Sequence, residues 1–274
     1  MAHLKGSLAI NPWRDIPLLR HVLHSTVICH SQLFQFMSLG HYESRRDVFN
    51  WRLRRLVDHG LISRHLIPPI SADHLYTITN SGAVCLERHG ESYVSISPLL
   101  QNERKVEALH LLHYLELNEI HLAMLRSQLS FNWIPESRLR SLATQGASPY
   151  VKAYDAIVEL TLEGQGLRIA LEYERTQKNS REYLEIRETI EKERNVSVVL
   201  YLLPSSCLLV RVAQHFQGCE FPILFGLVDE FRQALLEAPV SENDGISTRT
   251  LHEALKQSQK ISAARLLHVL LTPS

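Results

Sequence analysis

The first ninety residues alternate between amphipathic helical segments and short apolar segments. The periodicity of their apolar side chains predicts helices at about residues 16–25, 31–38 and 44–59, strands at 61–67 and 75–79, and a closing helix at 80–88. The two strands are joined by Pro-Pro-Ile-Ser-Ala-Asp-His, which indicates a hairpin with a wide loop. Three helices followed by a two-stranded wing are typical of a winged helix-turn-helix domain, which we place at residues 1–92.

The third predicted helix has one apolar side and one basic side. Its apolar positions, spaced by three and four residues, form the stripe that packs on the first two helices. The other side carries Arg45, Arg46, Asn50, Arg52, Arg54 and Arg55. Arg46, Asn50 and Arg54 recur every four residues and therefore project from one ridge, a geometry suited to a helix in the major groove.

These residue types favour double-stranded DNA as the partner. Guanidinium groups neutralise phosphates and bridge O6 and N7 of guanine, while asparagine pairs with adenine. Arg64, at the base of the predicted wing, adds a backbone contact. Two other interpretations remain: an exposed helix face that arginines only solvate, or a domain that binds protein.

The pattern from residue 103 onward predicts a second domain of α/β type, which we place at residues 103–237. Its expected elements are a helix at 103–129 broken near Asn118, a short strand at 131–134, a hairpin from Tyr154, a helix from Asn179 to about Arg194, and a buried strand at 196–203. Asn179 and Glu182 have the spacing of a capping box. The order of elements is that of a restriction-endonuclease core, so the expected fold class is α+β.

The hairpin from Tyr154 brings carboxylates together. If Leu162 faces Leu167 across a turn at 163–166, then Asp155 lies opposite Glu174 and Ile157 lies opposite Glu172. Asp155, Glu172 and Glu174 would then gather at one end of one face. Such a cluster needs a cation to relieve its repulsion, and Mg²⁺ or Mn²⁺ prefers carboxylate oxygens. These three residues are the candidate metal ligands, and an acidic face with no special role is the alternative.

Residues 238–274 are expected to form a polar linker and a C-terminal amphipathic helix. Leu251, Leu255, Ile261, Leu267 and Leu271 lie roughly along one stripe of that helix. Packing on its own domain is one interpretation, and docking on a partner protein or a second copy of the chain is the other.

Composition changes this picture mainly through charge. The 274 residues carry 29 Lys+Arg and 29 Asp+Glu, but residues 1–90 contain ten basic and six acidic residues. The basic excess therefore lies in the predicted DNA-binding domain. Apolar runs are too short to cross a bilayer, no secretory signal pattern begins the chain, and the four cysteines are scattered. We therefore expect a cytoplasmic protein with reduced thiols and no membrane partner.

Residues 17 to about 205 resemble the replication-relaxation family of plasmid and mobile-element proteins. The matching features are Arg52-Leu-Arg-Arg-Leu with Gly60-Leu-Ile, Trp133 and Glu136, Tyr154-Asp155-Ala156, and Leu171-Glu-Tyr-Glu-Arg-Thr176 with Lys178. The resemblance implies a winged helix followed by a PD-(D/E)xK-like nuclease domain. It also implies a DNA-binding accessory of plasmid replication, relaxation or mobilisation, working beside a relaxase.

The chain departs from the nuclease pattern at one decisive position. Active sites of that type carry an acidic residue, any residue and a lysine, whereas this chain has Glu172-Tyr173-Glu174. Lys178, or less directly Lys152, is the replacement cation, and without one phosphodiester cleavage loses electrostatic stabilisation. The leading hypothesis is therefore an inactive nuclease-like domain. The alternatives are a Mg²⁺- or Mn²⁺-dependent endonuclease using Asp155, Glu172, Glu174 and Lys178, and a winged-helix transcriptional or defence regulator with a ligand pocket in the second domain.

Overall fold

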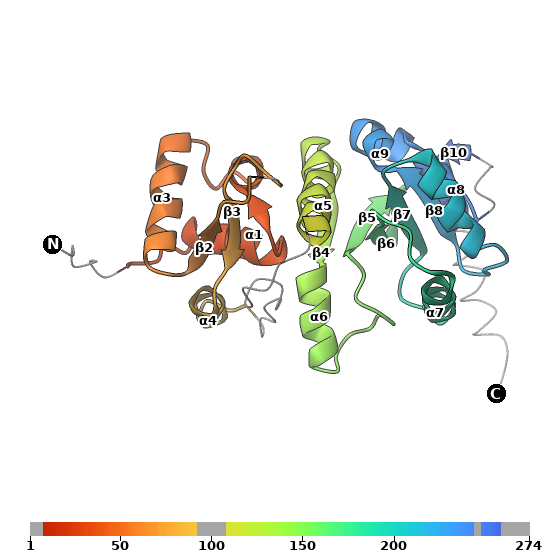
Figure 1. Ribbon diagram of the computed structural model, residues 1–274, viewed down its shortest axis with the longest axis horizontal. Coiled ribbons are helices and arrows are strands. Elements are labelled where there is room, and N and C mark those ends of the chain that lie inside the picture. The colour runs from red at the N-terminus through yellow and green to blue at the C-terminus, as the bar shows by residue number, and fades with distance from the viewer. Residues whose placement is uncertain (1–7, 69, 92–107, 244–247, 259–274) are drawn as a thin grey trace. The chain divides into compact units, whose positions relative to one another are not determined.

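The chain folds into two units, Met1–Arg126 and Ser127–Ser274 (Figure 1). The computed structural model describes residues 8–68, 70–91, 108–243 and 248–258. Helices combine with a three-stranded sheet in the first unit and a seven-stranded sheet in the second. This mixture confirms the expected α+β class. None of the described helices is long and apolar enough to cross a membrane.

The first unit is built mainly from helices around a small antiparallel sheet. Its elements are α1 (Asp15–His24), β1 (Ile28–Cys29), α2 (His30–Leu39), α3 (Arg46–Asp58), β2 (Ile62–His65), β3 (Leu75–Ile78), α4 (Asn80–Arg88) and α5 (Ala108–Arg126). The strand order is β1-β3-β2, and both pairings are antiparallel. The predicted helices and the hairpin are present within two residues at most ends, whereas the two-residue strand β1 was not predicted.

Helix α5 corrects two predictions. It runs without a break through Asn118, whose buried amide donates to the carbonyl of Val27 at 2.9 Å. Asn118 was expected to end the helix, but this hydrogen bond satisfies its amide inside the fold. The helix also packs on α2 and β1 and belongs to the first unit, although we expected it to begin the second domain. Residues 92–107 lie outside the described residues.

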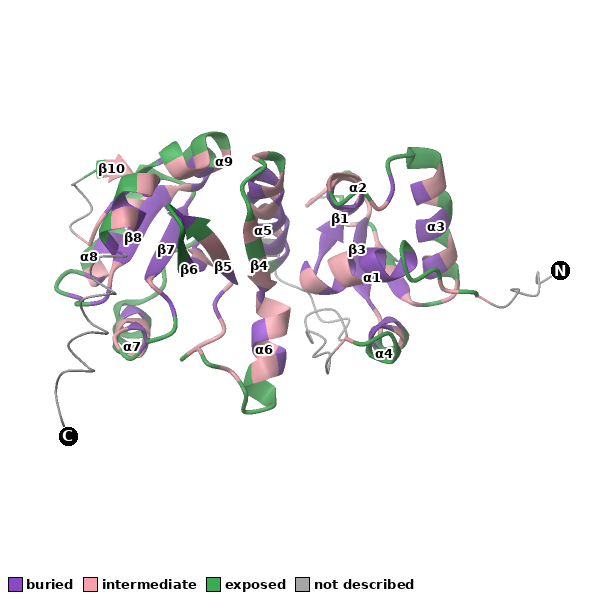
Figure 2. Cartoon of the chain, turned by 180° about the vertical axis from the view of Figure 1, so that it is seen from behind, coloured by how far each residue is buried: buried purple, intermediate pink, exposed green. Residues whose placement is uncertain are grey.

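The second unit is centred on one mixed sheet. Its elements are β4 (Phe131–Pro135), α6 (Glu136–Thr144), β5 (Ala156–Leu162), β6 (Gln165–Tyr173), α7 (Ser180–Ile190), β7 (Val198–Leu203), α8 (Ser206–His215), β8 (Ile223–Leu227), α9 (Val228–Ala234), a 3₁₀ turn (Leu235–Glu237), β9 (Pro239–Ser241) and β10 (Thr248–Thr250). The order across the sheet is β10-β9-β8-β7-β6-β5-β4. Strands β6, β7 and β8 are parallel, and all other neighbours are antiparallel. Strand β7 is buried along its whole length (Figure 2).

The hairpin of β5 and β6 is present, but its predicted register is wrong by two residues. Leu162 pairs with Gln165 instead of Leu167, and Ala156 pairs with Leu171 instead of Tyr173. The connection is a two-residue turn in which Glu163 and Gly164 have φ values of 50° and 81°. Two positive φ values match the right-handed twist of the strands, so the tight turn replaces the four-residue turn that we assumed. A shift of two residues leaves every side chain on its predicted face.

The C-terminal part is integrated into the sheet. Strands β9 and β10 extend the sheet beyond β8, and Leu251, Ala254 and Leu255 of the following helical residues 251–258 are buried. The boundary expected at 237/238 is therefore wrong, because the segment predicted to be a linker supplies the last two strands of the sheet on the β8 side. The capping box of α7 is confirmed, with the Asn179 side chain accepting from the backbone N–H of Glu182 at 2.9 Å. The rest of the predicted C-terminal helix, 259–274, lies outside the described residues.

Candidate nucleic-acid interface and acidic cluster

Helix α3 presents the predicted polar ridge on its solvent side. Phe49, Leu53 and Leu56 are buried in the core of the first unit and fix the orientation of the helix. Arg46 and Arg54 are exposed, and Asn50 between them is half-buried. Arg46 lies over the ring of Phe34, at 5.3 Å from its centroid. The predicted ridge is therefore formed, and its cations are accessible.

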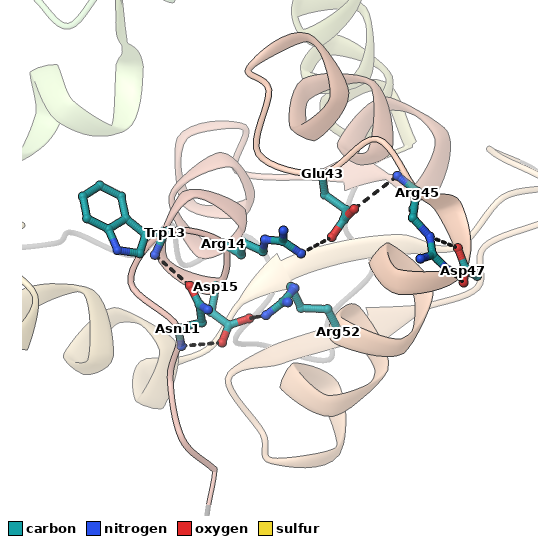
Figure 3. A network of polar contacts seen from close by, with 8 residues as sticks. All are labelled: Asn11, Trp13, Arg14, Asp15, Glu43, Arg45, Asp47 and Arg52. Atoms are coloured by element: carbon teal, nitrogen blue, oxygen red, sulfur yellow. Dashed lines mark hydrogen bonds and ion pairs between the residues drawn. The ribbon is translucent and has the colours of Figure 1, made fainter.

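Arg52 does not share this surface. Its Nη1 donates to Oδ1 of Asp15 at 2.7 Å, and the two side chains are only 9% and 2% exposed. Figure 3 shows this pair crossing from α3 to the start of α1, where the backbone N–H of Asn11 also donates to Asp15 at 2.7 Å. We correct the prediction for Arg52: it anchors α3 to α1 and is not available to DNA.

Arg45 is exposed but its charge is compensated. Its Nη2 lies 2.7 Å from Oδ2 of Asp47, and this neighbour raises the pKa of the guanidinium. The backbone N–H of Arg45 donates to Glu43 at 3.2 Å, and Glu43 in turn pairs with Arg14 at 3.0 Å (Figure 3). Arg45 therefore belongs to the network that holds the start of α3.

Trp51 is a surface residue that the sequence analysis overlooked. It lies on α3 with 53% of its surface exposed, and the Arg55 guanidinium lies 4.6 Å from its ring centroid. The sequence could have indicated this contact, because Trp51 lies in a basic helical stretch four residues before Arg55.

Four arginines of the predicted DNA-binding set are not neutralised by a carboxylate. Arg46, Arg54, Arg55 and Arg64 form no ion pair with any residue that the structure describes.

A pocket of about 240 Å³ lies between α3 and the β2–β3 hairpin, and we call it the helix–hairpin pocket. It is lined by His30, Asn50, Leu53, Arg54, Val57, Asp58, Arg64, His74 and Tyr76. Oδ1 of Asn50 and Nδ1 of His74 are fully buried and have no hydrogen-bond partner among the residues that the structure describes. Burial lowers the pKa of His30, whereas the nearby Asp73 and Asn50 act in the opposite direction. Oδ1 of Asn50 lies near this ring but does not form a hydrogen bond with it. Three of the predicted DNA-binding residues, Asn50, Arg54 and Arg64, thus line the same pocket.

The predicted acidic residues lie at one edge of the large sheet. Asp155 directly precedes β5, Glu172 lies near the carboxyl end of β6, and Glu174 follows that strand. Asp155 Oδ2 accepts from the backbone N–H of Tyr173 at 2.7 Å. Antiparallel pairing of β5 with β6 brings these ends to the same edge, as expected, although through a different register.

Two lysines compensate the two glutamates. Nζ of Lys152 lies 2.7 Å from Oε1 of Glu172, and Nζ of Lys178 lies 2.6 Å from Oε2 of Glu174. Tyr183 also donates its hydroxyl to Oε1 of Glu174 at 3.2 Å. Two lysines therefore supply the positive charge that the Glu-Tyr-Glu sequence lacks. Lys152 comes from the segment before β5, and Lys178 directly precedes Asn179, the N-cap of α7.

Burial dominates the electrostatics of Glu172. It raises the pKa of this carboxyl to about 7, although Lys152 acts in the opposite direction. For Lys152, burial lowers the pKa, but the charge and hydrogen bond of Glu172 together with the charges of Asp155 and Glu174 outweigh it, so the pKa is raised. Tyr201, which pairs with Glu172 on the neighbouring strand, has a buried hydroxyl with no hydrogen-bond partner in the described part of the chain.

This arrangement does not fit a metal ion held by all three carboxylates. Among the described residues, no group of three or more His, Cys, Asp or Glu side chains is placed to hold one. Carboxylate oxygens that would ligate a cation instead accept hydrogen bonds from Tyr173 and Tyr183 or form ion pairs with the two lysines. The predicted Mg²⁺ or Mn²⁺ site stays a prediction, and no reaction step through a metal follows from this geometry.

A much larger cavity lies at the opposite end of the same sheet. It measures about 1520 Å³ and its lining includes Phe131, Arg168, Arg187, Asn195 and Phe221. Arg168 pairs with Glu159 at 2.8 Å, and Arg187 pairs with Glu191 at 3.0 Å. The cavity is therefore mixed in polarity, and none of the predicted site residues lines it.

Comparison of the chain with protein-family models, with curated proteins and with solved structures found no match. The resemblance to the replication-relaxation family therefore depends on the sequence features alone. It stays a prediction, as do the functions that it implies.

Proposed function

We propose that the protein is a double-stranded DNA-binding accessory of plasmid or mobile-element replication, relaxation or mobilisation. In this proposal the first unit is a winged helix, with α3 in the major groove and the β2–β3 hairpin against the phosphate backbone. The observation that carries it is the ridge of Arg46, Asn50 and Arg54, beside Arg64, whose arginines have no ion pair among the described residues. Cations that no carboxylate neutralises retain their full attraction for phosphate.

The second unit is proposed to be a nuclease-like domain without activity. The strand, hairpin, helix and strand expected for a restriction-endonuclease core are present as β4, β5–β6, α7 and β7, with the additional helix α6 between β4 and β5. Lys152 and Lys178 neutralise Glu172 and Glu174, so the carboxylates have less need of a metal ion. The domain would then contribute further contacts to DNA or to a protein such as a relaxase.

Fluorescence anisotropy with labelled duplex DNA tests the DNA-binding proposal. Arg46→Ala and Arg54→Ala together are expected to weaken binding at 150 mM salt at least tenfold and to flatten its salt dependence. Arg88→Ala removes an exposed arginine from α4 of the same unit and serves as the control. Unchanged affinity of the double variant, or equal losses in all variants, would contradict the assignment of α3.

Two alternatives each have one supporting observation. Lys178 beside Glu174 is also compatible with an endonuclease, because it places a cation where the Glu-Tyr-Glu sequence lacks one. The 1520 Å³ cavity favours a regulator that binds a ligand in the second unit. Nicking of plasmid DNA with Mg²⁺ or Mn²⁺ that disappears in Asp155→Ala would establish the endonuclease. A small molecule that alters DNA affinity in the native chain, but not in Phe221→Trp, would establish the regulator.

A further inference from the structure

The helix–hairpin pocket joins two positive charges from separate elements. Arg54 lies on α3 and Arg64 lies on β2, and both line the pocket. Neither forms an ion pair with a described residue, although Asp58 lines the same pocket. With neutral histidines the lining therefore keeps an excess of one positive charge. Two guanidinium groups facing one cavity repel each other unless an anion lies between them.

The pocket also contains a polar atom without a partner. Nδ1 of His74 is buried and forms no hydrogen bond with any described residue. His74 is held in place by its backbone, because its N–H donates to Asp73 at 2.9 Å and its carbonyl accepts from the N–H of His30 at 2.9 Å. An unpaired buried polar atom destabilises the fold, so a ligand that forms a hydrogen bond with it is favoured. Such a ligand accepts a hydrogen bond in the tautomer that protonates Nδ1.

The size of the pocket limits the ligand further. Pockets for drug-sized molecules measure roughly 300–1,000 Å³, and this one is about 240 Å³. A compact anion with several acceptor oxygens suits both the volume and the donors. Arginine matches phosphate with two parallel N–H donors, and two arginines provide such a fork from each side.

We propose that the helix–hairpin pocket binds a phosphate group, held between Arg54 of α3 and Arg64 of β2, with His74 as a further donor. Given the proposed function, its source is one phosphate of the DNA backbone, clamped between the helix and the hairpin. This contact carries no sequence information but sets the register of α3 along the groove. The alternative source of the same chemistry is a free phosphate ion.

The salt dependence of duplex binding distinguishes one shared phosphate from two separate contacts. Each phosphate that is neutralised contributes about 0.9 to the slope of log K against log salt. The double variant Arg54→Gln, Arg64→Gln should reduce the slope by about 0.9 in total. Its fold-loss of affinity should be smaller than the product of the fold-losses of the two single variants, because both arginines contact the same phosphate. Arg46→Gln with Arg64→Gln is the matched comparison, since Arg46 does not line the pocket and should combine independently.

Titration of the full chain with inorganic phosphate tests the pocket without DNA. The imidazole NMR signals of His74 and His30 should shift and saturate, and Arg54→Gln with Arg64→Gln should abolish the shift. The exposed His89 is the control. Arg54→Lys with Arg64→Lys keeps the charges and should retain most of the response, which separates charge loss from misfolding.

The two measurements have distinct outcomes. A total reduction of the salt slope by about 0.9 in the Arg54→Gln, Arg64→Gln double variant supports the proposal with a DNA phosphate as the ligand, whether or not free phosphate also binds. Saturation by phosphate alone, with no duplex binding, supports the pocket but overturns the proposed function. A slope reduction of about 1.8 in the double variant, no reduction at all, or no response to either probe would overturn the proposal.

Discussion

The two units differ in which charged residues form ion pairs. In the first unit Asp15 and Glu43 are bonded to Arg52 and Arg14, which leaves the outward arginines of α3 and β2 uncompensated. In the second unit the acidic residues at the carboxyl edge of the sheet are themselves neutralised by Lys152 and Lys178. The difference indicates which unit can bind a charged partner. The first unit presents unpaired arginines toward solvent, whereas Glu172 and Glu174 of the second unit pair with lysines of the same unit.

The largest expected effect tests whether Arg52 is structural. Arg52→Met leaves Asp15 buried without its counter-charge, and breaking a buried pair in this way costs about 3–5 kcal/mol. Urea unfolding at pH 7, followed by tryptophan fluorescence, measures the loss. The control is Arg54→Met, an exposed position on the same helix, which should stay within about 0.5 kcal/mol of the native chain. A stable Arg52→Met chain with reduced DNA affinity would restore Arg52 to the DNA-binding set.

The second effect tests the internal compensation at Glu172. Its pKa in the folded chain is raised from 4.5 to about 7, so between these values the folded state binds more protons than the unfolded state. The stability from this carboxyl is therefore greatest below pH 4.5 and is lost as the pH rises through 7. The difference amounts to roughly 3 kcal/mol at about 1.4 kcal/mol per pKa unit.

Glu172→Gln should remove this part of the pH dependence. Unfolding free energies at pH 5, 6, 7 and 8 should change less steeply in the variant than in the native chain. Glu188→Gln, on the exposed side of α7, should leave the profile unchanged. Parallel profiles for the native chain and Glu172→Gln would show that the carboxyl titrates at its ordinary value, and that Lys152 offsets the effect of burial completely.

The smallest effect concerns the hydroxyl of Tyr201. Since this buried hydroxyl has no hydrogen-bond partner among the described residues, Tyr201→Phe should leave stability unchanged or raise it by about 1 kcal/mol. The matched variant is Tyr154→Phe, which removes a hydroxyl that donates to Glu193 at 3.1 Å and should destabilise by about 1 kcal/mol. Thermal unfolding of both variants measures the contrast. Equal destabilisation would mean that Tyr201 donates to a bound water or ligand.

Amphipathic periodicity was sufficient for most elements of both units. The helices α1 to α4, the β2–β3 hairpin, the capping box of α7 and the buried strand β7 all follow from residue spacing along the chain. Those patterns are local, because side chains three or four residues apart share a helix face and alternate residues share a strand face. The ridge of Arg46, Asn50 and Arg54 follows from the same rule.

Only the tertiary structure decided which charges are free and which are paired. Arg52 and Arg54 look alike in the sequence, yet the first faces Asp15, 37 residues away, and the second faces solvent. The register of β5 with β6, the placement of α5 in the first unit, and the meeting of Arg54, Arg64 and His74 likewise depend on chain segments that are distant in sequence. Spacing along one element determines which face a residue occupies, but its partner comes from whichever element packs against that face.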